Sequence, residues 1–130
     1  MGNAAFHDST LYLPAKCSIQ TLVGLLKDGD EKIRSNAAAA LGNLARNSEV
    51  LDGEFVGTGA NYQLVNMVIN DKSHSAKRVA IMAIINLLAL PESSKILKSL
   101  NLPSILSKFT LPNSADLNLA KTAQKALDKL

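Results

Sequence analysis

Apolar residues along this chain recur at steps of three and four, and the segment Lys32–Arg46 shows this most clearly. Its apolar positions fall on one face of a helix: Ile33, Ala37, Ala40, Leu41 and Leu44. Asp30 stands where a side chain accepts backbone N–H groups as an N-cap, and Asn47 and Ser48 follow as a natural stop. The pattern therefore predicts an amphipathic helix over residues 31–46.

The same spacing predicts a chain made mostly of helices. The expected segments are 18–27, 31–46, 49–56, 60–70, 74–89, 92–100, 102–110 and 115–129. Pro91 suits the first turn of a helix, because the N–H that proline lacks has no partner there. Gly24 falls inside a helix, where glycine costs about 1 kcal/mol relative to alanine, and this predicts close packing at that point. Residues 1–14 are less regular and are expected to hold a helix with an irregular lead-in.

The helical pattern repeats with a period of 43 residues. One shift by this period places Ala37, Ala40, Leu41 and Leu44 on Ala80, Ala83, Ile84 and Leu87. A second shift places them on Ala123, Ala126, Leu127 and Leu130. This register predicts a single domain over residues 1–130, divided into repeats at about 15–47, 48–90 and 91–130. Such periods are typical of stacked helical repeats.

Two stretches carry a resemblance to known families. LVGLLKDGDEKIRSNAAAALGNLA resembles the second and third helices of an armadillo repeat. The short helices expected at 49–56 and 92–100 add a third helix per repeat, which distinguishes this unit from the two-helix HEAT repeat. The resemblance implies an all-α, right-handed superhelix of about three armadillo (ARM/HEAT-like) repeats. IRSNAAAALGNLARNS resembles the armadillo-like stretch that follows the kinase domain in Fused-type serine/threonine kinases. That likeness implies a regulatory or docking region of a larger protein, with a small free-standing protein as the alternative.

The armadillo resemblance also implies a binding site. In this family an extended peptide lies along a concave groove lined by the third helices, where an asparagine clamps its backbone. Asn43 and Asn86 match that position, while Ala39 and Met82 replace the aromatic residue four positions earlier. The candidate site is the set Asn36, Ala39, Asn43, Val79, Met82, Asn86 and Lys125. Four of them could instead be structural: the helix asparagines Asn43 and Asn86 bond a neighbouring loop, and Val79 and Met82 pack against the adjacent repeat.

Composition and charge define the expected partner. The first 70 residues hold five basic and seven acidic groups, which gives a net charge of −2. The last 60 residues hold nine basic and four acidic groups, which gives a net charge of +5. Lys125 and Lys129 occupy the groove positions of the third unit, which favours a neutral to acidic protein or peptide. The alternative partner is nucleic acid or another polyanion, bound by a basic stripe of Arg34, Lys77, Arg78, Lys121 and Lys125. Aromatic residues make up only 4% of the chain, which disfavours stacking of single-stranded bases.

The remaining sequence features argue against other classes of protein. His7 and His74 lie 67 positions apart without metal-site spacing, and no nucleophile or phosphate-loop motif is present, so we expect no enzyme, cofactor or metal. No apolar run reaches the length of a membrane span. The single cysteine, Cys17, excludes an intrachain disulfide and favours the cytoplasm, with the nucleus as the alternative. Apolar residues near both ends, Leu11–Leu13 at the start and Leu127 and Leu130 at the end, leave self-association open.

Overall fold

The computed structural model describes residues 12–111 and 116–130, and these residues form helices and connecting turns without a strand. The helices are α1 (Tyr12–Leu25), α2 (Glu31–Asn47), the 3-10 turn η3 (Glu49–Leu51), α3 (Asp52–Gly57), α4 (Ala60–Asn70), α5 (His74–Leu87), α6 (Pro91–Ser99), α7 (Leu102–Ser107) and α8 (Leu117–Lys129). The all-α prediction is confirmed.

Several helix starts follow from local side-chain chemistry. The Asp30 side chain accepts the backbone N–H groups of Lys32 and Ile33 and so caps α2. Ser73 caps α5 in the same way, through the N–H of Ala76. Pro91 is the first residue of α6, as its missing N–H predicts.

The largest differences from the predicted helix boundaries are in α1 and α7, and one helix face also differs from the sequence prediction. Helix α1 begins at Tyr12 rather than at 18, and it tolerates Pro14 because the residue lies in the first turn. Helix α7 ends at Ser107, three residues before its expected end. In α2, Ile33 is 38% exposed, whereas Ala38 is fully buried. The predicted core face was therefore partly wrong, because α2 contacts both α1 and α5 and so buries two sides.

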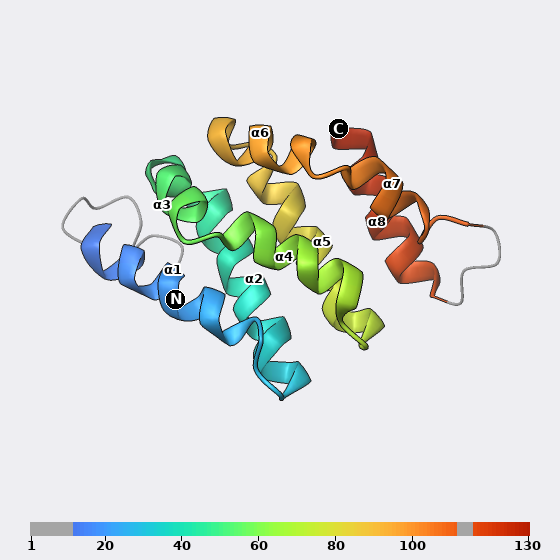
Figure 1. Ribbon diagram of the computed structural model, residues 1–130, viewed down its shortest axis with the longest axis horizontal. Helices are drawn as coiled ribbons and strands as arrows, with labels where there is room; N and C mark the ends of the chain where they lie inside the picture. Colours follow the sequence, from blue (N-terminus) through green and yellow to red (C-terminus); the bar gives the residue numbers. More distant parts are fainter. Residues whose placement is uncertain (1–11, 112–115) are drawn as a thin grey trace.

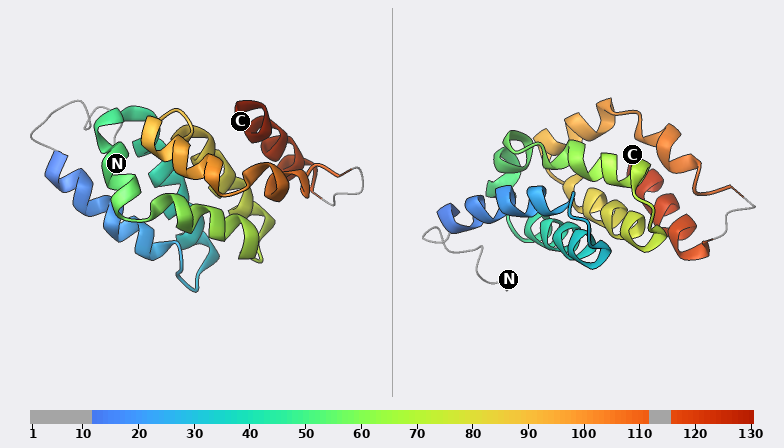
Figure 2. Two further views of the ribbon diagram at one scale, coloured as in Figure 1. Left: turned by 45° about the horizontal axis from the view of Figure 1, so that its top comes forward. Right: turned by 60° about the horizontal axis from the view of Figure 1, so that its bottom comes forward.

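The helices lie in two layers. Figures 1 and 2 show α2, α5 and α8 side by side in one layer, with α1, α4 and α7 in the other. We call these the α2–α5–α8 layer and the α1–α4–α7 layer. The short helices α3 and α6 contact each other near the end where α2 and α5 terminate (Figure 1). The successive third helices predicted by the 43-residue period thus become neighbours in space.

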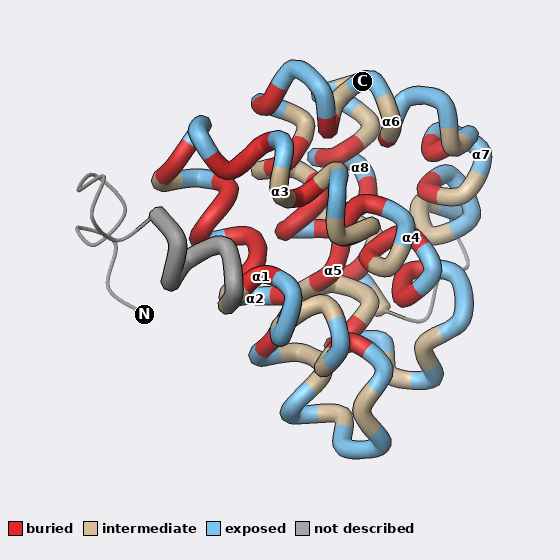
Figure 3. The backbone as a smooth tube through the Cα atoms, turned by 60° about the vertical axis from the view of Figure 1, so that its left-hand side comes forward, coloured by how far each residue is buried: buried red, intermediate tan, exposed pale blue. Residues whose placement is uncertain are grey.

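The core lies between the layers and is almost wholly aliphatic. Figure 3 shows the buried backbone concentrated on the inner sides of the helices. Phe55 is the largest of the fully buried side chains, and the other large side chains at this level of burial are isoleucines and leucines. Small residues set the helix spacing, since a Cβ at Gly42 would lie 3.0 Å from the Cα of Ala83. At Gly24 the prediction of close packing was wrong, because a Cβ there would meet no atom within 4 Å.

The apolar ends of the chain are only partly described. Leu127 and Leu130 are half-buried and pack against the core. Leu11 lies outside the described residues, and so do the side chains of Tyr12, Leu13 and Cys17. Among the described helices, none combines the length and the apolar character needed to cross a bilayer.

Candidate functional site

The candidate residues on α2 face solvent. Asn36, Ala39 and Asn43 are all exposed, and their steps of three and four place them on one side of the helix. The side chain of Asn43 has no hydrogen-bond partner among the described residues, although its backbone carbonyl accepts the amide of Asn47 at 2.7 Å. Its amide is therefore available to a ligand as both donor and acceptor.

The candidate residues on α5 are less exposed. Met82 is 48% exposed, and the Arg78 guanidinium lies 3.6 Å from its sulfur. Val79 and Asn86 are half-buried. The Nδ2 of Asn86 donates to the carbonyl oxygen of Gly42 at 3.1 Å, which brings Asn86 against α2, beside Asn43. Asn86 thus makes a structural contact, although with helix α2 rather than with the loop that the alternative interpretation predicted, and its side-chain oxygen remains as an acceptor.

The third helix of the layer adds positive charge. Lys121, Lys125 and Lys129 are exposed on α8, and Arg46 is exposed at the end of α2. Helices α2, α5 and α8 together contain two acidic residues, and both accept hydrogen bonds from neighbouring side chains. Glu31 accepts one from the Ser73 hydroxyl at 2.7 Å, and Asp128 accepts one from the Gln124 amide at 3.0 Å. The solvent side of the α2–α5–α8 layer is therefore basic toward α8.

A cavity of about 430 Å³ opens where the three helices end. Its floor is apolar, and its polar lining comes from Arg46 and Glu49 after α2, Asn86 on α5 and Lys129 on α8. Asn86 and Lys129 occupy equivalent positions of successive repeats, because they are one 43-residue period apart. Arg46 and Glu49 were missed because nothing local shows that the end of α2 meets the end of α5. The cavity can hold an apolar side chain between two cationic groups.

An ion pair fixes the opposite end of the same layer. The Nε and Nη2 atoms of Arg34 donate to the two carboxylate oxygens of Asp71 at 2.7 and 3.1 Å, and Nη1 donates to the carbonyl of Asp28 at 2.9 Å. The side-chain hydrogen bond to Asp71 raises the pKa of Arg34. Burial alone would raise the pKa of Asp71, but the hydrogen bonds from Arg34 and from the backbone of Ser73 outweigh it and hold that pKa below its ordinary value. Arg34 is thus a structural residue.

Two further polar contacts lie between α5 and the segment that follows α7. The Lys77 ammonium lies 5.3 Å from the centre of the Phe109 ring. The Nδ1 of His74 lies 3.9 Å from a carboxylate oxygen of Asp116. These two side chains alone do not form a metal-binding site. No group of three or more His, Cys, Asp or Glu side chains suited to a metal ion occurs in the described part of the chain.

Comparisons with known proteins agree with this architecture. The Armadillo/beta-catenin-like repeat family matches residues 16–46. The designed armadillo repeat protein YIII(Dq)4CqI superposes with a TM-score of 0.71 at 30% sequence identity, over 86% of this chain and 46% of its own. An engineered protein of known crystal structure gives a TM-score of 0.76 at 24% identity, over 85% and 44% of the two chains. The chain therefore has the fold of armadillo-repeat proteins, and residues 16–46 match the model of that family.

A natural relative extends the comparison. Serine/threonine-protein kinase 36 from Pongo abelii, a Fused-type kinase, is 30% identical over 113 residues. The match covers 87% of this chain but only 8% of the relative's length, in a region outside the kinase domain. The similarity therefore concerns a helical segment and carries no kinase residue.

Proposed function

We propose that this chain is a non-catalytic scaffold that binds a peptide segment on the solvent side of the α2–α5–α8 layer. The observation that carries the proposal is the hydrogen bond from Asn86 to Gly42, the residue that precedes Asn43. Asn43 has a free amide, and Asn86 has a free side-chain oxygen. Amides of this kind pair with a peptide backbone whatever its side chains. Repeats at about 15–47, 48–90 and 91–130 supply one helix each to this face.

The charge on the layer selects the ligand. Lys125 and Lys129 on α8 and Arg46 on α2 favour a neutral to acidic segment, extended or helical, and disfavour a basic one. The exposed Met82 adds a surface that adapts to varied apolar side chains. The cavity between the helix ends receives an apolar side chain of the same segment.

The fold and the relative also support a cellular role. The likeness to a segment of a Fused-type kinase that lies outside its kinase domain supports a regulatory or docking role within a longer protein. We place it in the cytoplasm, with the nucleus as the alternative compartment.

The test uses a displayed library of random 12-residue peptides selected on the intact chain. Selected peptides should carry carboxylates, and the double variant Asn43→Ala/Asn86→Ala should weaken their binding about tenfold or more, because two hydrogen bonds worth about 0.5–1.5 kcal/mol each are lost. Lys125→Glu/Lys129→Glu should also weaken binding and flatten its salt dependence. The matched control is Lys95→Glu/Lys98→Glu, which reverses two exposed lysines of α6. Unchanged affinity in both test variants would place the peptide interface elsewhere.

A further inference from the structure

Helix α4, in the opposite layer, has a solvent face without charge. Its eleven residues include no Asp, Glu, Lys or Arg. Six of them are buried, and the other five face outward: Tyr62, Gln63, Asn66, Ile69 and Asn70. Tyr62 is 51% exposed and Ile69 is 50% exposed. Solvent-facing sides of helices ordinarily carry charged residues, so this composition asks for an explanation.

The five outward residues form one continuous surface. They are related by steps of three, four and seven, which are the spacings of neighbours on a helix face. Tyr62 and Ile69 lie along one edge of this face, and the amides of Gln63, Asn66 and Asn70 form a row along the other. Within the row, the Asn70 amide donates to the side-chain oxygen of Asn66 at 2.6 Å. We call these five residues the α4 face.

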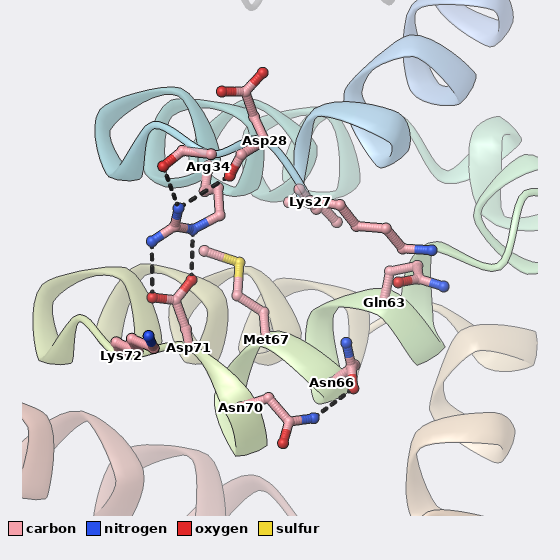
Figure 4. Close-up of a pocket in the computed structure, with 11 residues that line it drawn as sticks. Lys27, Asp28, Arg34, Gln63, Asn66, Met67, Asn70, Asp71 and Lys72 are labelled. Atoms are coloured by element: carbon pink, nitrogen blue, oxygen red, sulfur yellow. Dashed lines mark hydrogen bonds and ion pairs between the residues drawn. The ribbon is translucent and has the colours of Figure 1, made fainter.

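A cavity of about 440 Å³ adjoins the amide row. Leu26 and Met67, both nearly buried, contribute apolar surface to its lining. Figure 4 shows Lys27 extending toward Gln63 at one end of the row and Lys72 beyond Asn70 at the other. Both lysines are exposed.

The acidic groups of this cavity are already engaged. Asp71 is paired with Arg34, and the Asp28 carboxylate accepts the backbone N–H of Asp30 at 2.9 Å. The ammonium groups of the two lysines make no hydrogen bond or ion pair with another described residue. The surface therefore offers two ammonium groups at the ends of a row of amides, beside a tyrosine and an isoleucine.

This composition is that of a binding surface. Protein interfaces are depleted of charge at their centre and enriched in tyrosine, with polar groups at the rim. Amide side chains bond a polypeptide backbone, and ammonium groups at the rim attract carboxylates. A single exposed apolar side chain would not indicate a binding site. The charge-free face and the lysine-flanked cavity together indicate a ligand that is uncharged at its centre and acidic at its ends.

We propose that the α4 face and its adjoining cavity form a second protein-binding surface, in the layer opposite to the α2–α5–α8 layer. Its ligand is a partner-protein segment with an uncharged centre, whose apolar side chains cover Tyr62 and Ile69. A carboxylate at each end of the segment reaches Lys27 and Lys72. This inference does not depend on the peptide site proposed above.

The experiment selects peptides from a displayed random 12-residue library on the unmodified chain. Each selected peptide is then classified by the variants of the chain that weaken its binding. The variants are Tyr62→Ser/Ile69→Ser and Lys27→Glu/Lys72→Glu, with Lys95→Glu/Lys98→Glu on α6 as the control of equal charge change. All six positions are exposed, so the folded chain should tolerate the changes, and circular dichroism checks this. We expect a set of peptides, acidic at both ends, whose Kd rises at least tenfold in both α4 variants and stays unchanged in the control.

The same peptides should bind Lys125→Glu/Lys129→Glu as they bind the unmodified chain. That result would support the second surface even if no peptide depends on Asn43 and Asn86. The inference is overturned if no selected peptide responds to the α4 variants, or if the responding peptides lack acidic ends. It is also overturned if sedimentation shows a dimer that Tyr62→Ser/Ile69→Ser dissociates, since the ligand of the face would then be a second copy of the chain.

Discussion

Single glycines show how far one residue can decide the packing of this molecule. Gly42 and Gly24 both lie in helices, and the sequence singled out Gly24 because an isolated glycine in a helix is costly. The structure places the close contact at Gly42, whose missing side chain admits Ala83 and whose carbonyl accepts the Asn86 amide. Gly42 follows closely after four alanines, residues 37–40. Among so many small residues, the sequence gives no sign that the position of this glycine is the one where helices approach closely.

The two glycines should respond differently to the same substitution. Gly42→Val should lower the free energy of unfolding by about 1–3 kcal/mol, because its side chain meets the backbone of Ala83. Gly24→Val should change it by less than about 0.5 kcal/mol, since open space surrounds that position and valine's helix propensity is close to glycine's or better. Urea unfolding followed by circular dichroism measures both. Equal effects would contradict the assigned contact.

Asp71 should make stability depend on pH. Its folded-state pKa lies below the ordinary value, so its ion pair stabilises the fold above the unfolded pKa of about 3.9, and that contribution is lost as pH falls through the folded pKa. Asp71→Asn should therefore lower the Tm at pH 7, and the difference from the unmodified chain should shrink toward about pH 2.5. Asp128→Asn, at an exposed carboxylate, is the control and should have little effect throughout. A difference for Asp71→Asn that stays constant across thermal melts from pH 7 to 2.5 would argue against the ion pair.

At the scale of elements, the contacts within a helix were predictable and those between helices were not. Asp30 and Ser73 cap helix starts because the N–H groups they accept lie within three residues, and Pro91 marks a helix start through the N–H that it lacks. Helix α6 shows the other case: its N-terminal N–H groups bond a carboxylate from α3, forty residues earlier. No local pattern reveals such a partner. The 43-residue register predicted which helices become neighbours, but the pairings and the cavities depend on side chains brought together only by folding.

Asp52 should therefore contribute more than an ordinary helix cap. Its buried carboxylate accepts the N–H groups of Glu92 and Ser93 at 2.8 and 3.0 Å and the Ser93 hydroxyl at 2.7 Å. Asp52→Ala should cost about 2–4 kcal/mol, since it removes a cap and leaves buried donors unpaired. Asp30→Ala, at an exposed cap, should cost about 1 kcal/mol. Amide exchange should accelerate at Glu92 and Ser93 in the first variant alone, and unchanged protection there would contradict the cap across helices.

At the scale of the whole molecule, charge divides the two layers. Exposed cations gather on α2 and α8, while α4, at the middle of the opposite layer, has none. The five-residue basic stripe expected from the sequence is interrupted, because Arg34 is bound to Asp71 and Lys77 lies over Phe109. Sequence register placed these residues on corresponding positions, but it could not show that two of them are already engaged. The remaining cations suit carboxylates on a short segment better than a long phosphate backbone.

Nucleic acid should accordingly bind only weakly and without specificity. For a fluorescein-labelled 20-nucleotide single strand, we expect a Kd weaker than about 10⁻⁵ M at 0.15 M salt, within the range of non-specific electrostatic binding. The described surface offers few aromatic side chains on which bases stack, which removes the sequence-tolerant part of single-strand affinity. Arg78→Glu/Lys121→Glu should abolish the residual binding, whereas Asn43→Ala/Asn86→Ala should leave it unchanged. Fluorescence anisotropy at several salt concentrations measures both, and a salt slope corresponding to about six or more phosphate contacts would favour a polyanion surface instead.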